Sequence, residues 1–312
     1  MGKQDLRSWI AKMEAAGEVQ HVTGANRDEE IGGIVDFYQR KTGNKAVLFD
    51  EVPGYPKGHR VPANILTSVR RIHHTPGNPI DSSPIELVHY WRRYMKEART
   101  IAPKFVNTGA LLENVEEGKA IDIFKIPVPK WHELDGGYYI GTGDMVIMKD
   151  PDTGWINYGA YRVQAQDSNV ASVMCSKGKH GDLIMRKYFE RGQPCPIAVV
   201  CGMHPILFMI AGLEIPYGKN EYDAAGGLMG EAIEVIKAPR TGLPIPAHAE
   251  IAFEGFIHPN DLIKEGPLGE WTGYYAGGLK KEPAIRIETF MYRNNPILMG
   301  AIPGLPPDGA SF

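Results

Sequence analysis

Long hydrophobic runs, cysteine pairs and an excess of one charge are all missing from this sequence. No apolar segment approaches the roughly 18 residues of a membrane-spanning helix, and the first residues lack the apolar core of a signal peptide. The 34 Lys and Arg residues are balanced by 37 Asp and Glu residues, so no basic surface for nucleic acid is expected. The three cysteines include no Cys-x-x-Cys pair. These absences predict a cytoplasmic protein with reduced thiols that binds neither nucleic acid nor membranes.

Several motifs of phosphate and nucleophile chemistry are also missing. The sequence has no Walker loop, no Gly-x-Gly-x-x-Gly after a strand and no Gly-x-Ser-x-Gly elbow. The stretch HELDGG at 132–137 is not His-Glu-x-x-His, so it does not indicate a zinc protease. Nucleotide hydrolysis and serine esterase chemistry therefore find no support in these motifs.

Glycine and proline are abundant, with 36 and 24 residues, which favours many short strands joined by turns. From about residue 105 short β-rich runs dominate, separated by Gly, Pro or Asn-Asp turns. Asp5 is placed to cap a helix that Gly17 ends. Further helices are expected at about 29–41, 84–99, 180–191 and 205–212, and strands at 45–52 and 60–66. The sequence predicts an α+β fold, with an N-terminal α/β domain at 1–115 and a barrel-like β domain at 116–312.

Two pairs of basic residues give no functional expectation. Arg70 and Arg71 are predicted to be solvated, as most arginines are. His73 and His74 are predicted to form a loop pair, with no cysteine or acidic cluster beside them.

Three polar side chains could together hold a metal ion. Asn157 opens NYGAYR, His180 lies between glycines in KGKHGD, and Glu221 follows a Gly-Lys-Asn turn. Two oxygen donors and an imidazole, without a thiolate, suit Mn²⁺ or Mg²⁺. By default His180 is a solvated loop residue and Glu221 a solvated turn residue, and the spacing of the three residues is not diagnostic by itself. The same holds for Arg162, which could be a surface arginine beside a bulge.

The stretch EGPLGEWTGYY places Glu265 and Glu270 on a segment that cannot form a helix, because Pro267 removes a backbone donor and the glycines lower helix propensity. Residues five apart on an extended chain point to opposite faces unless the chain bends. A Gly-Pro bend could therefore bring both carboxylates into one cavity, where an arginine between them would keep one ionised. The spacing alone favours a surface turn with two solvated acids.

Taken together, these stretches resemble the UbiD family of prenylated-FMN-dependent decarboxylases. They appear in the family's order, from about Asp5 to about Leu305: HELDGGYYIGTGDMVIMKDPDTGWINYGAYR, KGKHGDLIMRKY, IPYGKNEYDAAGGLMGEAIEVIK, PAHAEIAFEGFI and EGPLGEWTGYY. The resemblance implies an N-terminal α/β domain followed by a split β-barrel that binds prenylated FMN. Family members usually continue into a C-terminal domain, which is expected to be missing after GLPPDGASF.

The resemblance also implies roles for individual residues. Arg162, Glu265 and Glu270 match the family's catalytic Glu-Arg-Glu network, with Glu270 as the proton donor. The positions that hold a Mn²⁺-type ion on the flavin phosphate match Asn157, His180 and Glu221. Backbone carbonyls near Tyr158, Ala211 and Leu213 match those around K⁺. Lys179 stands where some members carry Gln next to the flavin, and Tyr158 where some carry Trp. The cofactor contacts thus implied are Asn157, Tyr158, Arg162, Lys179, His180, Ala211, Leu213 and Glu221.

The function implied is reversible decarboxylation of an unsaturated, aromatic or heteroaromatic acid. A flavin prenyltransferase would supply the cofactor, and the full-length protein would be a homo-oligomer, with dimers built by the C-terminal domain. Two rival hypotheses stay open on the residues alone. One is a non-catalytic protein, or a truncated decarboxylase, that holds flavin phosphate; the other is a metal hydrolase that uses His180 and Glu221.

Overall fold

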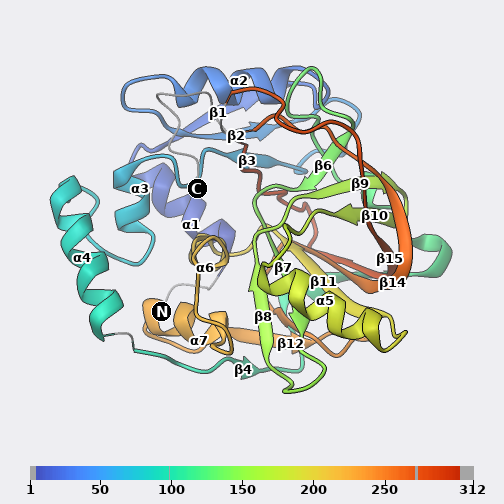
Figure 1. The fold of residues 1–312 in the computed structure, drawn as a ribbon. Coiled ribbons are helices and arrows are strands. Elements are labelled where there is room, and N and C mark those ends of the chain that lie inside the picture. Colours follow the sequence, from blue (N-terminus) through green and yellow to red (C-terminus); the bar gives the residue numbers. More distant parts are fainter. Residues whose placement is uncertain (1–4, 98, 271–272, 303–312) are drawn as a thin grey trace.

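The N-terminal part of the chain forms a small three-stranded sheet with helices around it (Figure 1). The computed structural model describes residues 5–97, 99–270 and 273–302; positions 271–272 of the acidic stretch and the final residues 303–312 lie outside it. Strand β1 runs parallel to β2, and β2 runs antiparallel to β3. The elements of this part are α1 (Leu6–Ala15), β1 (Val19–Thr23), α2 (Glu30–Gln39), β2 (Ala46–Asp50), β3 (Val61–Ala63), α3 (Val69–His74) and α4 (Pro84–Glu97).

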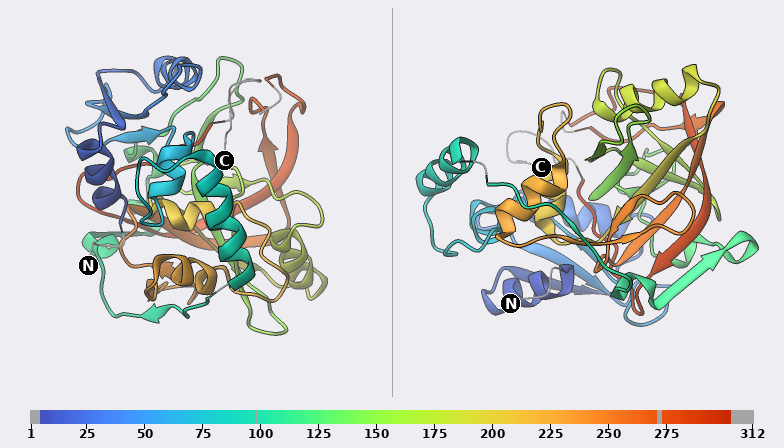
Figure 2. Two further views of the ribbon diagram at one scale, coloured as in Figure 1. Left: turned by 90° about the vertical axis from the view of Figure 1, so that its left-hand side faces the viewer. Right: turned by 90° about the horizontal axis from the view of Figure 1, so that it is seen from below.

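The first helices begin and end where local sequence signals place them. Asp5 caps α1, its Oδ1 accepting the Ser8 N–H at 2.8 Å, and the apolar stripe of the helix is buried. Pro84 begins α4, which has no buried residue and lies at the edge of the molecule (Figure 2). The helices predicted from residues 5, 29 and 84 are therefore confirmed.

The second half of the chain forms a nine-stranded sheet that curls into a half-barrel (Figures 1 and 2). Its order is β6-β9-β10-β15-β14-β11-β7-β8, and β5 pairs with β15 outside this path. The strands are β5 (Asn114–Glu117), β6 (Tyr138–Gly141), β7 (Asp144–Lys149), β8 (Ile156–Gly159), β9 (Val163–Asp167), β10 (Val170–Val173), β11 (Cys195–Cys201), β14 (Ile251–Glu265) and β15 (Lys280–Tyr292). The predicted α+β architecture is confirmed, whereas the domain boundary at 115/116 stays a prediction.

Strands β14 and β15 are much longer than predicted, with 15 and 13 residues. The Asn-Asp pair expected to end a short strand lies inside β14, where the pairing register with β15 shifts between Ile257 and Leu262. Asn260 takes up the irregularity with a φ of 64°, a conformation that asparagine tolerates better than most residues. Because the strand resumes after this bulge, it carries Glu265 to the far end of the ladder, opposite Lys280.

Helices α5 (His180–Glu190), α6 (Pro205–Ala211) and α7 (Glu221–Met229) complete this part, together with a three-stranded sheet and three short 3₁₀ helices. The expectation that Glu221 lies in a turn is wrong, because it is the first residue of α7. Asn220 caps that helix by accepting the Tyr222 N–H at 3.0 Å. The remaining elements are β4 (Lys104–Phe105), β12 (Glu234–Lys237), β13 (Pro244–Pro246), η1 (Ala110–Glu113), η2 (Gly118–Ala120) and η3 (Ile123–Lys125).

Three residues of the two basic pairs are not as predicted, whereas Arg70 is exposed as expected. His73 and His74 lie in α3, and Arg71 has no exposed surface. Its guanidinium donates to Glu18 and to oxygen atoms of the 44–67 segment. Each of the three guanidinium nitrogen atoms therefore has a hydrogen-bond acceptor. Such a set of acceptors lets an arginine replace its hydration shell on burial. Arg71 also joins Glu18, immediately before β1, to the segment that follows β3.

Both faces of the curled sheet are covered, as β11 illustrates. Ile197, Val199 and Cys201 belong to one apolar cluster, while Ala198 and Val200 belong to the other. This explains why the strand is almost uniformly apolar instead of alternating. Within the described residues, no helix combines the length and apolar character needed to span a membrane.

Helix α2 contacts the second half of the chain through Gly32, which lies against the backbone of Trp131. A Cβ on Gly32 would lie 1.7 Å from the Trp131 carbonyl oxygen, while a Cβ on the neighbouring Gly33 would meet nothing within 4 Å. The Trp131 ring in turn packs on Gly300, where a Cβ would lie 2.1 Å from the ring. The helix can approach this closely only because residue 32 has no side chain.

Replacing Gly32 and Gly33 by alanine should therefore have opposite effects on stability. Gly32→Ala forces backbone atoms apart and should lower the free energy of unfolding by about 2 kcal/mol or more. Gly33→Ala adds only helix propensity and should raise it by about 0.5–1 kcal/mol. Chemical denaturation of both variants measures the difference. Equal effects would show that α2 does not depend on this contact.

Candidate active site

The guanidinium of Arg162, in the connection between β8 and β9, binds two carboxylates. Nη2 donates to Glu265 Oε2 at 2.8 Å, and Nη1 donates to Glu270 Oε1 at 3.1 Å. Burial acts to lower the pKa of Arg162, but the hydrogen bond and charge of Glu265 outweigh it and raise that pKa. The predicted convergence of the two acids on one arginine is thus confirmed. The surface-arginine alternative is wrong, because only 15% of the Arg162 side chain is exposed.

The two carboxylates differ in their surroundings. The Glu265 side chain is fully buried and also accepts a hydrogen bond from Tyr139 Oη at 3.0 Å, so both of its oxygens are engaged. The Glu270 side chain keeps 33% of its surface exposed. Burial and the Glu265 charge raise the pKa of Tyr139, which therefore stays a hydrogen-bond donor. Glu265 is held from several sides, whereas Glu270 can reach a substrate or solvent.

The bend between the two acids follows from its residue types. Gly266 has a φ of 87°, in the region that favours glycine, and its N–H donates to Gln164 Oε1 at 3.1 Å. Leu268 is buried in the apolar cluster and fixes the middle of the bend. The chain therefore turns immediately after the last residue of β14.

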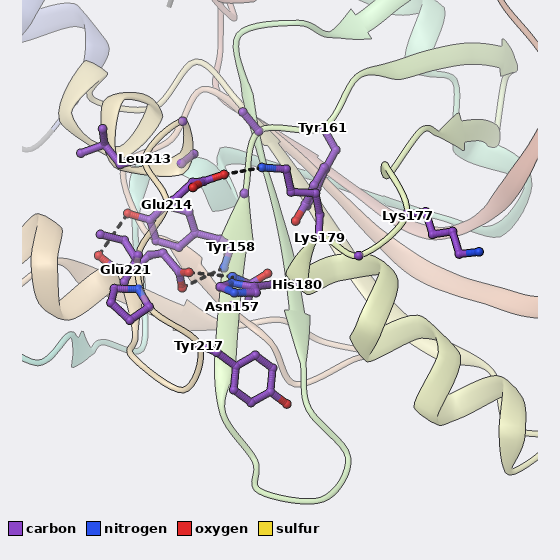
Figure 3. A pocket seen from close by; sticks show the side chains of 17 residues that line it. Asn157, Tyr158, Tyr161, Lys177, Lys179, His180, Leu213, Glu214, Tyr217 and Glu221 are labelled. Carbon is purple, nitrogen blue, oxygen red and sulfur yellow. Dashed lines mark hydrogen bonds and ion pairs between the residues drawn. The ribbon is translucent and has the colours of Figure 1, made fainter.

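Asn157, His180 and Glu221 come together from three elements: β8 and the first turns of α5 and α7 (Figure 3). Asn157 Nδ2 donates to Glu221 Oε1 at 2.6 Å and lies 3.4 Å from His180 Nδ1. The Tyr158 N–H donates to the other oxygen of Glu221 at 3.2 Å. The expectation that Glu221 is solvated is wrong, because it is 2% exposed, and Asn157 is also buried, at 3% exposure.

These three residues fit a divalent cation. Asn157 Oδ1 is buried and has no hydrogen-bond partner among the described residues. Burial raises the pKa of Glu221 to about 7, and burial together with Lys179 lowers the pKa of His180. No group of three His, Cys, Asp or Glu side chains that could hold a metal occurs in the described part of the chain, so the third protein ligand here would be an amide oxygen. An amide oxygen, a carboxylate and an imidazole suit Mn²⁺ or Mg²⁺.

The three residues line one end of a cavity of about 630 Å³ (Figure 3). Ala160, Tyr161 and the segments 177–180 and 211–217 form most of the remaining wall. Lys179 Nζ pairs with Glu214 Oε1 at 2.7 Å, and both side chains are largely exposed at the rim. A cavity of this size with a polar end is large enough for a small organic cofactor.

Carbonyl groups at the positions expected around K⁺ retain free acceptor capacity. The Ala211 carbonyl accepts the Ala160 N–H at 3.1 Å, and the Leu213 carbonyl accepts the Ile215 N–H at 3.0 Å. Each carbonyl oxygen has a second lone pair. Tyr158 has a different surrounding: its side chain is buried, and its hydroxyl donates to the Glu221 carbonyl at 3.3 Å. It therefore supports the start of α7.

Three functional neighbours were not identified in the sequence: Tyr139, Gln164 and Asp135. Tyr139 and Gln164 contact the Glu265 bend directly, and Asp135 accepts the Gly269 N–H. Tyr139 follows DGG in β6, but Tyr139, Ile140 and Gly141 are all buried, so no alternation of burial distinguishes it. No local sequence signal identifies Gln164 or Asp135, because their hydrogen-bond partners lie more than 100 residues away in sequence.

Two family models match the chain. The model described as the 3-octaprenyl-4-hydroxybenzoate carboxy-lyase Rift-related domain matches residues 104–306, and the model of the carboxy-lyase N-terminal domain matches residues 10–91. The pyrrole-2-carboxylic acid decarboxylase of Pseudomonas aeruginosa is 32% identical, over 97% of this chain and 62% of its own length.

Solved structures of other proteins share the fold, and two of them illustrate the similarity. The vanillic acid decarboxylase of Sedimentibacter hydroxybenzoicus superposes with a TM-score of 0.92 at 26% identity, over 98% of this chain and 65% of that one. The UbiD-class enzyme HmfF of Pelotomaculum thermopropionicum, an evolved dimeric form in complex with prFMN, gives 0.87 at 25% identity, over 97% of this chain and 68% of that one. The chain thus spans about two thirds of the length of these relatives. The chain belongs to the UbiD family.

Proposed function

We propose that this protein is a carboxy-lyase that uses prenylated FMN to decarboxylate, reversibly, an unsaturated aromatic or heteroaromatic acid. The observation that carries the proposal is the Arg162 guanidinium held between one buried and one accessible carboxylate. The relatives support it, because one is named for pyrrole-2-carboxylic acid, another for vanillic acid, and a third was solved with prFMN. When bound, prenylated FMN supplies the electron sink that decarboxylation requires.

Arg162 is proposed to bind and orient the substrate carboxylate. Its Nε is buried and has no hydrogen-bond partner among the described residues, so one donor remains available. Glu265 fixes the guanidinium by its bond at 2.8 Å and keeps it charged. A guanidinium that is fixed in position and charged is well suited to bind a planar carboxylate.

Glu270 is proposed to deliver the proton that replaces CO₂, and to remove it in the carboxylation direction. Its bond to Arg162 at 3.1 Å places it beside the carboxylate-binding group, and its partial exposure connects it to solvent. Glu265 is less suited to this role, because Arg162 and Tyr139 occupy both of its oxygens. The unequal surroundings of the two carboxylates therefore favour Glu270 as the group that transfers the proton.

The cavity of about 630 Å³ is proposed to bind the cofactor. Asn157, His180 and Glu221 would hold Mn²⁺ or Mg²⁺ against its phosphate, and the carbonyls of Tyr158, Ala211 and Leu213 would hold K⁺. Lys179 would contact the flavin from the rim. A metal bridge explains how phosphate can bind without a lysine-containing phosphate loop. A flavin prenyltransferase as cofactor supplier and a homo-oligomeric full-length protein complete the proposal.

The proton-transfer role predicts a large effect of Glu270→Gln. The full-length gene product, produced together with a flavin prenyltransferase, should release CO₂ from at least one acid of a panel of pyrrole, furan, cinnamate-like and hydroxybenzoate acids. Glu270→Gln should lower this rate by about 100-fold or more without changing the bound chromophore, because general acid catalysis supplies at least that factor. Incorporation of solvent deuterium into the product measures the same step.

Glu29→Gln is the matched control, because Glu29 is an exposed acid that lines the same cleft as Glu270. Its rate should stay within about twofold of the unmodified protein, as expected for a surface substitution. Equal rates for the two variants would remove Glu270 from the mechanism. A protein that holds the chromophore and turns over no acid would instead support the flavin-binding alternative.

The metal role predicts that Glu221→Gln weakens Mn²⁺ binding by about tenfold or more, since it removes a charged ligand. Flavin retention in gel filtration should fall with it. Glu214→Gln is the control, because this acid lies on the rim of the same cavity and is 87% exposed. Equilibrium dialysis against Mn²⁺ measures both variants. Unchanged Mn²⁺ affinity in Glu221→Gln would contradict the assigned ligand set.

A further inference from the structure

The loop that carries Glu270 is fastened to a distant segment, residues 132–136. The Gly136 N–H donates to the Pro267 carbonyl at 2.8 Å. A Cβ on Gly136 would lie 1.9 Å from the Gly266 carbonyl oxygen, so the two backbones are in direct contact. The position of the 266–270 loop therefore depends on the 132–136 segment as well as on its own bend.

Asp135 is the central group of this attachment. Its side chain has no exposed surface, and both of its oxygens accept backbone hydrogen bonds. Oδ2 accepts the His132 N–H at 2.8 Å, and Oδ1 accepts the Gly269 N–H at 2.9 Å. Bonds from N–H groups to a carboxylate are stronger than bonds between neutral groups. The N–H that Oδ1 binds belongs to the residue immediately before Glu270.

The two oxygens serve different purposes. The bond from His132 is local and shapes the turn in which Asp135 itself lies, as aspartates in turns commonly do. The bond from Gly269 spans 134 residues and contributes nothing to that turn. A carboxylate needed only for the local turn would use one oxygen and leave the other to solvent. The burial of the second oxygen is explained by the bond to the Glu270 loop.

Contacts on both sides of Glu270 reinforce this attachment. The His132 ring packs on Gly269, where a Cβ would lie 2.7 Å from the ring Nδ1. On the other side of Glu270, Tyr275 Oη accepts the Leu134 N–H at 3.1 Å. The 132–136 segment therefore contacts the chain before and after Glu270. By contrast, the Glu270 side chain is bound to Arg162 and partly exposed, so its backbone must supply much of its positioning.

We propose that Asp135 is a positioning residue, which acts through the Gly269 N–H to hold Glu270 at the distance from Arg162 that proton transfer requires. The inference rests on the proposed function of Glu270, since it assigns a role to the support of that residue. Displacing a reacting group by about 1 Å can lower a rate by about 100-fold, so a support of this kind affects catalysis without touching the substrate.

Amide hydrogen exchange tests the positioning directly and does not depend on activity. In Asp135→Asn the charge is lost and one oxygen is replaced by an N–H donor, so neither the His132 nor the Gly269 amide keeps a charged acceptor, and at most one keeps an acceptor on this side chain. The 266–270 segment, and the Gly269 amide in particular, should exchange about tenfold faster or more, as expected for loss of a hydrogen bond to a charged acceptor. The core strand β11 should keep its exchange rate.

Glu254→Gln is the matched control. Glu254 is also fully buried, and its carboxylate accepts the backbone N–H groups of Arg240 and Thr241, both at 2.8 Å and both outside the Glu270 loop. Its substitution should leave exchange of the 266–270 segment unchanged. Equal exchange of this segment in Asp135→Asn and the unmodified protein would overturn the proposal, and so would a rise spread evenly over all segments.

Kinetics of the cofactor-loaded full-length protein test the consequence. Asp135→Asn should lower kcat about tenfold or more with KM within about threefold, because Arg162 and not Glu270 binds the substrate carboxylate. The bound chromophore should match that of Glu254→Gln. Unchanged kcat, or a loss that only follows lost chromophore, would overturn the positioning role. If the unmodified protein releases no CO₂, the proposed function fails, while the exchange result still decides whether Asp135 holds the loop.

Discussion

Arg162 must satisfy two carboxylates that come from one short loop, and much of the surrounding structure meets that requirement. Burying a guanidinium is unfavourable unless its charge is matched, and Glu265 matches it at 2.8 Å inside the protein. This pair needs β14 to continue past its bulge, so that Glu265 ends the strand beside β9 and the Tyr139 hydroxyl. The second carboxylate is then free to remain partly exposed. One matched pair thus makes the other acid available for chemistry.

Local sequence signals were sufficient to predict the helices that begin with a capping residue or a proline. Asp5, Pro84 and the apolar stripe of α1 predict their helices because capping and periodicity act within a few residues. The helix α7 was missed because Gly226 and Gly227 indicate a turn, whereas the close approach of residues 99–101 requires glycine there: a Cβ on Gly227 would lie 1.7 Å from the Arg99 carbonyl oxygen. Tertiary contact overrides propensity at this helix.

The charged groups were predicted less well, for a different physical reason. Exposure rules place arginines and acids in solvent, but Arg71, Glu221 and Glu265 are buried because partners distant in sequence replace their hydration. The Arg162–Glu265 pair spans 103 residues, which no spacing argument can anticipate. The resemblance to a family supplied the pairing, whereas composition and periodicity favoured a surface turn. Asp135 carried no signal at all, since its role depends on the Gly269 amide.

The cofactor end and the proton-transfer end of the proposed site are mechanically linked. Asn157 and Arg162 are separated by one short stretch, and Tyr161 within it accepts the Gly181 N–H at 3.1 Å through its hydroxyl. Gly181 follows His180, and Tyr161 directly precedes Arg162, so this tyrosine connects the start of α5 to that arginine. A Cβ on Gly159 would meet that tyrosine ring at 3.0 Å, which leaves the ring little room to move. A group bound between Asn157, His180 and Glu221 would therefore be held in a fixed position relative to Arg162, and the 132–136 segment would hold Glu270 against the same arginine.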